Sequence, residues 1–167
     1  VTVNDGGMVA TNGTMLVGGA GGGTLTVSNG GSVSAQTGFT IGSSSSGLGM
    51  VTFNESNTSL DVASGGAVVG FSGDGTLRIE NGATASVQQA FFLGYSATGV
   101  GSATVTGNDS SLEAIGDIYV GVDGDGTLIG DGGGVVTTPG SVFLATYASS
   151  EVTVEVASGA TLAVGDD

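Results

Sequence analysis

The sequence predicts an all-β protein: a right-handed, three-sided parallel β-helix of about seven coils, each 24–28 residues long. Similar runs of strand-type residues recur along the chain, three runs make one unit, and a small residue closes each unit. The closing residues are Gly18, Gly42, Gly70, Gly94, Gly121, Ala145 and Gly165. They lie 24, 28, 24, 27, 24 and 20 positions apart, so shorter and longer units alternate.

The unit that closes at Gly94 shows the three runs, which are TLRI, TASV and FFLG, and the unit that closes at Gly42 repeats them as TLTV, SVSA and FTIG. Strands this short cannot bury a face within one unit. Stacked units can, because each strand then pairs in parallel with its equivalent about 4.8 Å away. Parallel crossovers are right-handed in nearly all proteins, which gives the predicted hand.

Alternate residues of each run are expected to point inward and to form three apolar columns. The first column is Val3, Val27, Phe53, Ile79, Val105 and Val154. The second is Val33, Leu60, Ala85, Leu112 and Val136. The third is Val17, Ile41, Val69, Leu93, Val120 and Leu144.

The corners between first and second strands also alternate. Shorter units turn through glycine-rich segments, 28–31, 80–83 and 130–134, whereas longer units use the polar segments 54–59 and 106–111. Glycine permits the positive φ angles of tight corners. An antiparallel sandwich or barrel would also explain alternation and glycine-rich turns, but not the recurrence of equivalent strands in sets of three. We therefore expect one β-solenoid over residues 1–167, as a fragment of a longer repeat array.

The strings GTLTVSNGGSV, GTLRIENGATASV and LGYSATGVGSATVTGNDSSLEAIGDIYVG carry a family resemblance. From about Gly18 to Ala145 the chain resembles the type V secretion and PEP-CTERM-associated repeat family, whose two-coil units occur in bacterial autotransporter passengers and other exported surface proteins. The resemblance implies an exported β-helical stalk or adhesin-like passenger, located extracellularly or at the bacterial outer-membrane surface. It transfers no catalytic residue. The segment Gly130–Ser141, with Pro139, and the irregular last unit depart from the repeat.

The net charge of −14 argues against nucleic acid or an anionic membrane as a partner, since both attract basic surfaces. The chain has no Cys, which removes disulfides and thiolate metal sites. It has no apolar run of about 18 residues, so we expect no membrane insertion by this segment. No cofactor is predicted.

No catalytic constellation is predicted, and we expect the protein not to be an enzyme. Asp61 and Glu113 occupy equivalent outward positions two coils apart, with Ser86 between them, which is typical of a solvated face. Arg78 is the only basic residue and is expected to pair with Glu80. Without His, Cys or Lys, activated nucleophiles are missing, so a polysaccharide-active enzyme is the least favoured alternative.

Two further motifs have plain structural explanations. The DGDG segment (123–126) is predicted to be a turn, with weak calcium binding at Asp123 and Asp125 left open because the spaced acids of a calcium loop are absent. Outward threonines form a column that suggests an ice-binding face, yet Arg78 and Ile129 interrupt it, and Thr is favoured on any exposed strand. The column is Thr2, Thr26, Thr52, Thr104 and Thr153.

The third strands carry an apolar outward column, and most aromatic residues lie on it or just beyond it. The outward column is Leu16, Thr40, Val68, Phe92, Tyr119 and Phe143. We define the aromatic edge as Phe71, Phe92, Tyr95, Tyr119, Phe143 and Tyr147. Such a stripe is typical of a contact surface for a protein or a glycan. The alternative is the opposite strand phase, with Ile41 and Leu93 outside.

We therefore expect a non-enzymatic, adhesin-like passenger or stalk segment that presents a rigid surface for adhesion or self-association. The alternatives are a glycan-binding module that uses the aromatic edge, or a fibre subunit that assembles through its open ends, where unpaired strand edges invite stacking.

Overall fold

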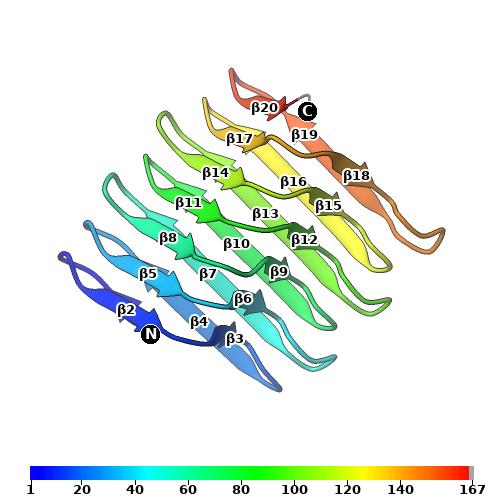
Figure 1. Ribbon diagram of the computed structural model, residues 1–167, viewed down its shortest axis with the longest axis horizontal. Coiled ribbons are helices and arrows are strands. Elements are labelled where there is room, and N and C mark those ends of the chain that lie inside the picture. Colours follow the sequence, from blue (N-terminus) through cyan, green and yellow to red (C-terminus); the bar gives the residue numbers. More distant parts are fainter. Residues whose placement is uncertain (166–167) are drawn as a thin grey trace.

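The computed structural model describes residues 1–165, which form β-strands and turns with no helix. The strands wind into six complete coils and two strands of a seventh, and each complete coil gives one strand to each of three sheets (Figure 1). Every strand pair is parallel and joins equivalent segments of successive coils. The three-sided β-solenoid is thus confirmed, and hairpin pairing of sequence neighbours is excluded.

The strands are as follows, in spatial order. The first sheet contains β1 (Thr2–Val3), β4 (Gly22–Val27), β7 (Leu48–Asn54), β10 (Asp74–Glu80), β13 (Val100–Thr106), β16 (Asp125–Asp131) and β19 (Val152–Val156). The second contains β2 (Met8–Thr11), β5 (Ser32–Ala35), β8 (Ser59–Val62), β11 (Thr84–Val87), β14 (Ser111–Ala114), β17 (Val135–Thr138) and β20 (Thr161–Val164). The third contains β3 (Thr14–Val17), β6 (Gly38–Ile41), β9 (Ala67–Val69), β12 (Phe91–Leu93), β15 (Ile118–Val120) and β18 (Val142–Leu144).

The predicted count of seven coils is slightly too high. Gly165, expected to close a third strand of the seventh coil, instead follows β20 of the second sheet, and its N–H donates to the Thr138 carbonyl at 2.7 Å. The interval from Ala145 to Gly165 is short because it contains only two strands, β19 and β20. A small residue can follow a strand of any of the three sheets, so Gly165 does not mark the end of a third strand.

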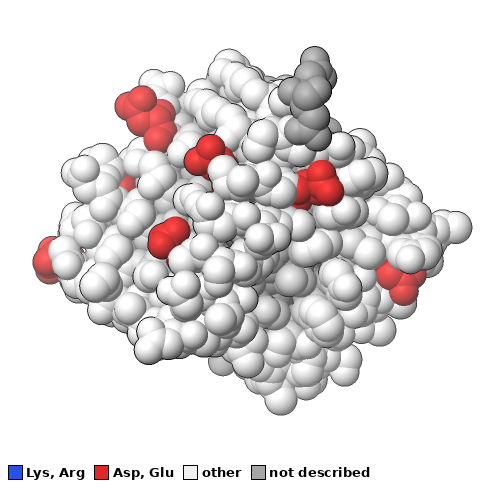
Figure 2. All heavy atoms as spheres, in the orientation of Figure 1, with Lys and Arg blue, Asp and Glu red and all other residues white. Residues whose placement is uncertain are grey.

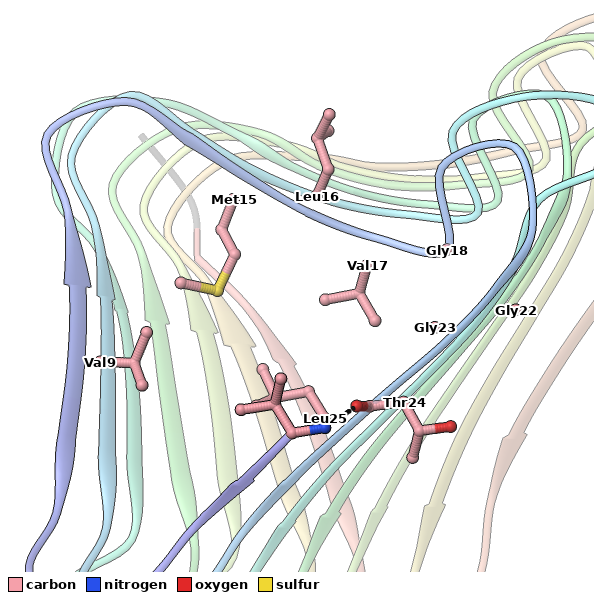
Figure 3. A pocket seen from close by; sticks show the side chains of 10 residues that line it. Val9, Met15, Leu16, Val17, Gly18, Gly22, Gly23, Thr24 and Leu25 are labelled. Atoms are coloured by element: carbon pink, nitrogen blue, oxygen red, sulfur yellow. Dashed lines mark hydrogen bonds between the residues drawn. The ribbon is translucent and has the colours of Figure 1, made fainter.

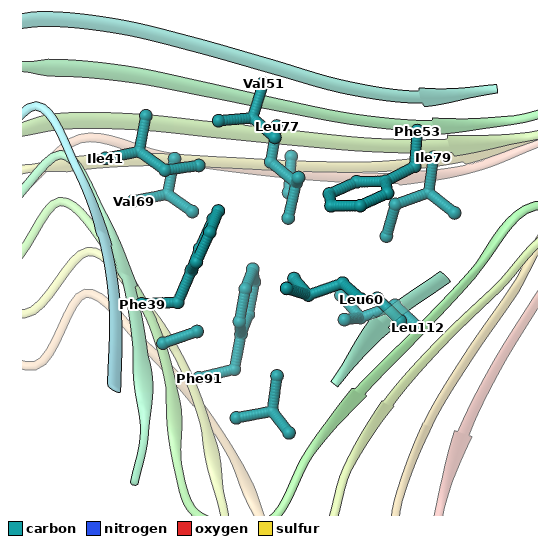
Figure 4. Close-up of a cluster of buried hydrophobic side chains, with 14 of the residues drawn as sticks. Phe39, Ile41, Val51, Phe53, Leu60, Val69, Leu77, Ile79, Phe91 and Leu112 are labelled. Atoms are coloured by element: carbon teal, nitrogen blue, oxygen red, sulfur yellow. The ribbon is translucent and has the colours of Figure 1, made fainter. Parts of the chain in front are cut away.

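The interior is packed by stacking large side chains against small ones. In the third sheet Phe39, Ala67 and Phe91 are successive partners, and all three are buried. The coil that carries Ala67 supplies Phe53 and Leu60 from its other two sheets, and both point into the interior that Phe39 and Phe91 also occupy (Figure 4). Close packing rewards such volume compensation, which explains why the residues of one column differ in size.

The predicted second and third columns are confirmed by strand register, as is the first column as far as Val105. Val154 was placed wrongly: it pairs with Leu128, and Val156 takes the place opposite Gly130. The error is a shift of two residues along β19. Because side chains alternate with a period of two, this shift keeps every apolar residue on the same face, so alternation alone could not detect it.

The two corner types of the central coils bond to each other. Thr58 and Ser110 are fully buried at polar corners of longer coils. The Thr58 hydroxyl accepts from the Gly30 N–H at 3.2 Å, and the Ser110 hydroxyl accepts from the Gly82 N–H at 2.9 Å. Gly30 and Gly82 lie in the glycine-rich corners of the preceding coils, at φ of 74° and 89°. Each polar corner thus satisfies a donor of the tighter corner beneath it, which accounts for their alternation.

Candidate functional site

The outer face of the third sheet carries the column of apolar and aromatic residues that the sequence predicts. Strand pairing places its members in one row, Leu16, Thr40, Val68, Phe92, Tyr119 and Phe143. Ile41 and Leu93, which the opposite strand phase would expose, have 0% exposed area. The alternative phase is therefore wrong, and the aromatic residues lie outside.

Three rings of this row form a continuous stack. The ring centroids of Phe92 and Tyr119 are 4.9 Å apart, and those of Tyr119 and Phe143 are 4.8 Å apart, with interplanar angles of 15° and 14°. The separations match the spacing of neighbouring strands, so parallel pairing itself holds the rings in contact. Stacked rings cover each other's faces, and the surface of this part of the edge is formed mainly by ring rims.

A second stack begins at the bend that follows the third strands. Phe71 and Tyr95 follow closing glycines of successive coils, and their rings stack at 5.1 Å with an interplanar angle of 10°. Tyr95 also meets Phe92 edge to face at 5.3 Å and 86°. Five of the six predicted aromatic residues therefore form one connected cluster.

The polar end of Tyr119 has one side-chain partner. Its hydroxyl donates to Oδ2 of Asp117 at 3.3 Å, and Oδ1 of the same carboxylate accepts the Ser141 N–H at 2.8 Å. Partial desolvation raises the pKa of Tyr119, and the charge and hydrogen bond of Asp117 raise it further. Both effects favour the neutral phenol at the centre of the ring stack.

The aromatic edge stays partly open to solvent. Phe71 and Tyr95 are each 38% exposed, Phe143 is 42% exposed and Tyr147 is 60% exposed, whereas Phe92 and Tyr119 are half-buried between their neighbours. Large apolar side chains that remain exposed in a connected group are typical of an interaction surface.

Tyr147 extends the aromatic edge by a different arrangement. It lines a hollow of about 360 Å³ together with Tyr95, Ser96, Val122 and Asp123. Sequence reasoning placed both tyrosines on this edge and named Asp123 only as a possible weak calcium ligand, and it missed Ser96 and Val122. The available signal was positional, since Val122 follows the closing residue Gly121 as Tyr95 follows Gly94.

The two acidic side chains of the DGDG segment accept hydrogen bonds from residues of the next coil. Oδ1 of Asp123 accepts the Ser149 hydroxyl at 2.8 Å, and Oδ1 of Asp125 accepts the Glu151 N–H at 2.9 Å. Within residues 1–165, no group of three or more acidic, His or Cys side chains is placed to hold a metal ion. These carboxylates therefore have a structural use, as ties between neighbouring loops.

The remaining acids are distributed over several surfaces. Asp61, Ser86 and Glu113 are successive partners on the outer face of the second sheet, as predicted. The Arg78 guanidinium lies 3.3 Å from the Glu80 carboxylate, which confirms the predicted surface ion pair. Figure 2 shows carboxylates in separate groups on the face in view, instead of one acidic cleft.

The outer threonine row differs from the prediction at its last member. Because β19 is shifted, Glu155 pairs with Ile129 and Thr153 pairs with Thr127. The row therefore reads Thr2, Thr26, Thr52, Arg78, Thr104, Ile129 and Glu155. Three of its seven residues are not threonine, and two of these three are the last in the row, which weakens the ice-binding alternative.

An apolar hollow lies at the first coil. Val9, Met15, Val17 and Leu25 point into it, whereas Leu16 points away (Figure 3). Its volume is about 460 Å³, and its lining continues the interior columns. It is therefore suited to the apolar side chains of a further stacked coil, and its lining offers no carboxylate to a polar ligand.

The comparisons with known proteins add no relative. No family model matches the chain, and neither a curated protein nor a solved structure gives a match. Among the described residues, no helix is long and apolar enough to cross a membrane.

Proposed function

We propose that this chain is a rigid, non-enzymatic stalk or passenger segment of an exported bacterial surface protein, and that it presents the aromatic edge for adhesion or self-association. The observation that carries the proposal is the connected, partly exposed ring cluster on a continuous parallel ladder. A solenoid is built by nearest-neighbour contacts, so each added coil lengthens the segment and adds an interface that stabilises it.

The surface chemistry supports an extracellular or outer-membrane location and a protein or glycan partner. With a net charge of −14, the segment repels nucleic acid and anionic lipid headgroups. The interior depends on apolar stacking and backbone pairing, so the fold needs no disulfide in an oxidising compartment. The sequence resemblance to secreted repeats points the same way.

The aromatic edge is tested by removing its central rings. We expect Phe92→Ser with Tyr119→Ser to abolish adhesion of cells that display the segment, because the first stack loses two of its three rings and the second loses its contact with Phe92. The matched control is Thr52→Ser with Thr104→Ser, which changes two residues of another outer face and should leave adhesion intact. Unchanged adhesion and unchanged sedimentation of a folded Phe92→Ser, Tyr119→Ser variant would contradict the proposal.

A fibre subunit is the second candidate, favoured by the apolar hollow at the first coil. Its test is the sedimentation coefficient across protein concentrations. Polymers that survive loss of the aromatic rings but disappear with Val9→Asp would identify the end, instead of the edge, as the associating surface. Product release from any member of a plant and bacterial polysaccharide panel would contradict the non-enzymatic assignment.

A further inference from the structure

The hollow between Tyr95 and Tyr147 has the size and lining of a site for a small ligand. It is formed by the bends that follow the third strands of three successive coils, and its volume is about 360 Å³. Two aromatic rings, one aliphatic side chain, one hydroxyl and one carboxylate line it. Ligand sites combine a mainly apolar lining with a few polar groups in this way.

A change of residue size between coils creates the hollow. Phe71, Tyr95 and Val122 occupy equivalent places, because the Tyr95 N–H bonds to the Gly70 carbonyl and the Val122 N–H bonds to the Gly94 carbonyl. Phe71 covers the face of Tyr95 that is directed toward the preceding coil. The next coil supplies the smaller Val122, which leaves the other face of Tyr95 without a stacked ring.

Tyr147 stands on the far side of this gap. Its N–H donates to the Val122 carbonyl at 2.9 Å, which places Tyr147 one coil beyond Val122 and two coils beyond Tyr95. Two coil spacings correspond to about 10 Å. Both tyrosines line the same hollow, so a cation bound in it lies near both rings, and cation–π attraction acts within roughly 6 Å of a ring centroid.

The hollow is negatively charged and lacks a counter-charge from the chain. Asp123 lines it, and only Oδ1 of this carboxylate is bonded, to Ser149, which leaves Oδ2 able to face a ligand. The single basic residue, Arg78, is paired with Glu80 on β10 of the first sheet. With a net charge of −14, the whole molecule adds to the local attraction for a cation.

We propose that the hollow between Tyr95 and Tyr147 is a binding site for an organic ammonium group, with the cation between the two rings and against the Asp123 carboxylate. A quaternary ammonium suits the hollow best, because its methyl groups can contact the rings and because the cation, which has no N–H, is only weakly hydrated. The site would let a surface segment hold a cationic partner without any basic residue of its own.

A neutral pyranose is the competing ligand. It would stack on the free face of Tyr95 and use the Ser96 hydroxyl, but it leaves the Asp123 charge uncompensated. The charge of the hollow therefore favours the cation, and a sugar becomes an outcome of the test.

Choline is the probe, and the tyrosine ring signals in proton NMR are the readout. The chain has only 3 Tyr, so each ring can be followed. We expect saturable shifts of Tyr95 and Tyr147 at millimolar choline, about 1–10 mM, with little change at Tyr119. The uncharged isostere, in which carbon replaces the ammonium nitrogen, should bind at least about fivefold more weakly.

Three variants sharpen the test. Asp123→Asn should weaken choline binding by about fivefold, whereas Asp61→Asn, with the same loss of charge on the second sheet, should leave it unchanged. Val122→Phe should extend the Phe71–Tyr95 stack, fill the hollow and abolish binding without unfolding the chain.

The proposal is overturned if the isostere shifts the rings as strongly as choline does. It is also overturned if methyl glucoside binds and choline does not, or if Val122→Phe leaves choline binding intact. Adhesion through the stacked rings of Phe92 and Tyr119 is a separate claim, which the Phe92→Ser, Tyr119→Ser variant tests independently of choline binding.

Discussion

The inner and outer faces of the third sheet are both rich in apolar residues, yet different contacts hold them. On β12, Phe91 points inward and is completely buried, while its neighbour Phe92 points outward and is half-buried. Phe91 belongs to the buried apolar core of the solenoid. Phe92 touches other rings of the surface, in its own row and at the adjoining bend. The inner row is therefore fixed by the fold, and the outer row is free to serve another purpose.

The largest difference should come from truncating these two phenylalanines. Phe91→Ala should lower the free energy of unfolding by about 3–5 kcal/mol, since it leaves a cavity in the core. Phe92→Ala should cost about 1 kcal/mol, because a half-exposed ring loses less contact. Urea unfolding measures both values. Equal losses would mean that the two faces are not distinct.

Two glycines of the first sheet, Gly101 on β13 and Gly22 on β4, should differ in their tolerance of a side chain. A Cβ on Gly101 would overlap the Val69 carbonyl oxygen and the Gly94 nitrogen, whereas a Cβ on Gly22 would meet nothing within 4 Å. Gly101→Ala should therefore lower stability by about 3 kcal/mol, since backbone atoms must move. Gly22→Ala, measured in the same thermal unfolding series, should be nearly neutral.

The outer stack itself predicts a smaller, specific coupling. In a double-mutant cycle, Phe92→Ala and Tyr119→Ala should show a coupling energy of about 0.5–1.5 kcal/mol, as expected of stacked rings. Phe92→Ala and Leu16→Ala, which are three strand spacings apart in the same row, should be additive within about 0.5 kcal/mol. Additivity of the first pair would show that the rings stack without stabilising each other.

The smallest effect is a pH dependence centred on the outer row. The pKa of Tyr119 is raised in the folded protein, first by desolvation and then by Asp117. Folding therefore favours the neutral phenol, and this contribution is present below about pH 10 and is lost as the pH rises above it. Tyr119→Phe should remove that part of the alkaline loss of stability, as measured by urea unfolding midpoints at about pH 8 and about pH 11.

Alternation along the third strands favoured one strand phase from the sequence and left the opposite phase open, and the complete burial of Ile41 and Leu93 in the structure decides between them. Alternation could not fix the register of β19. A slip of two residues keeps the same residues inside, so Val154 was assigned to the position that Val156 occupies. Loop length and packing decide between two registers that differ by two residues, and the alternation of apolar residues is the same in both.

The proposed ammonium site was not predicted from the sequence, for a related reason. Ser96, Val122 and Asp123 lie in bends, and their proximity to Tyr147 depends on how three coils of different loop length stack. The repeat pattern located each bend, but it could not place side chains that are outside the strands. The DGDG segment was noticed for its acids, while the decisive neighbour was Val122, a small residue where the preceding coils carry rings.

Both faces depend on the direct stacking of equivalent strands, and engineered disulfides test it in a chain that has no Cys. Thr26 and Thr52 are partners in parallel strands, so their Cα atoms are about 4.8 Å apart, within the range that a disulfide bridges. We predict that Thr26→Cys with Thr52→Cys forms an intramolecular disulfide under mild oxidation, while Thr52→Cys with Asp61→Cys, on different sheets, does not. A disulfide in the second pair and none in the first would indicate a hairpin and would contradict the account.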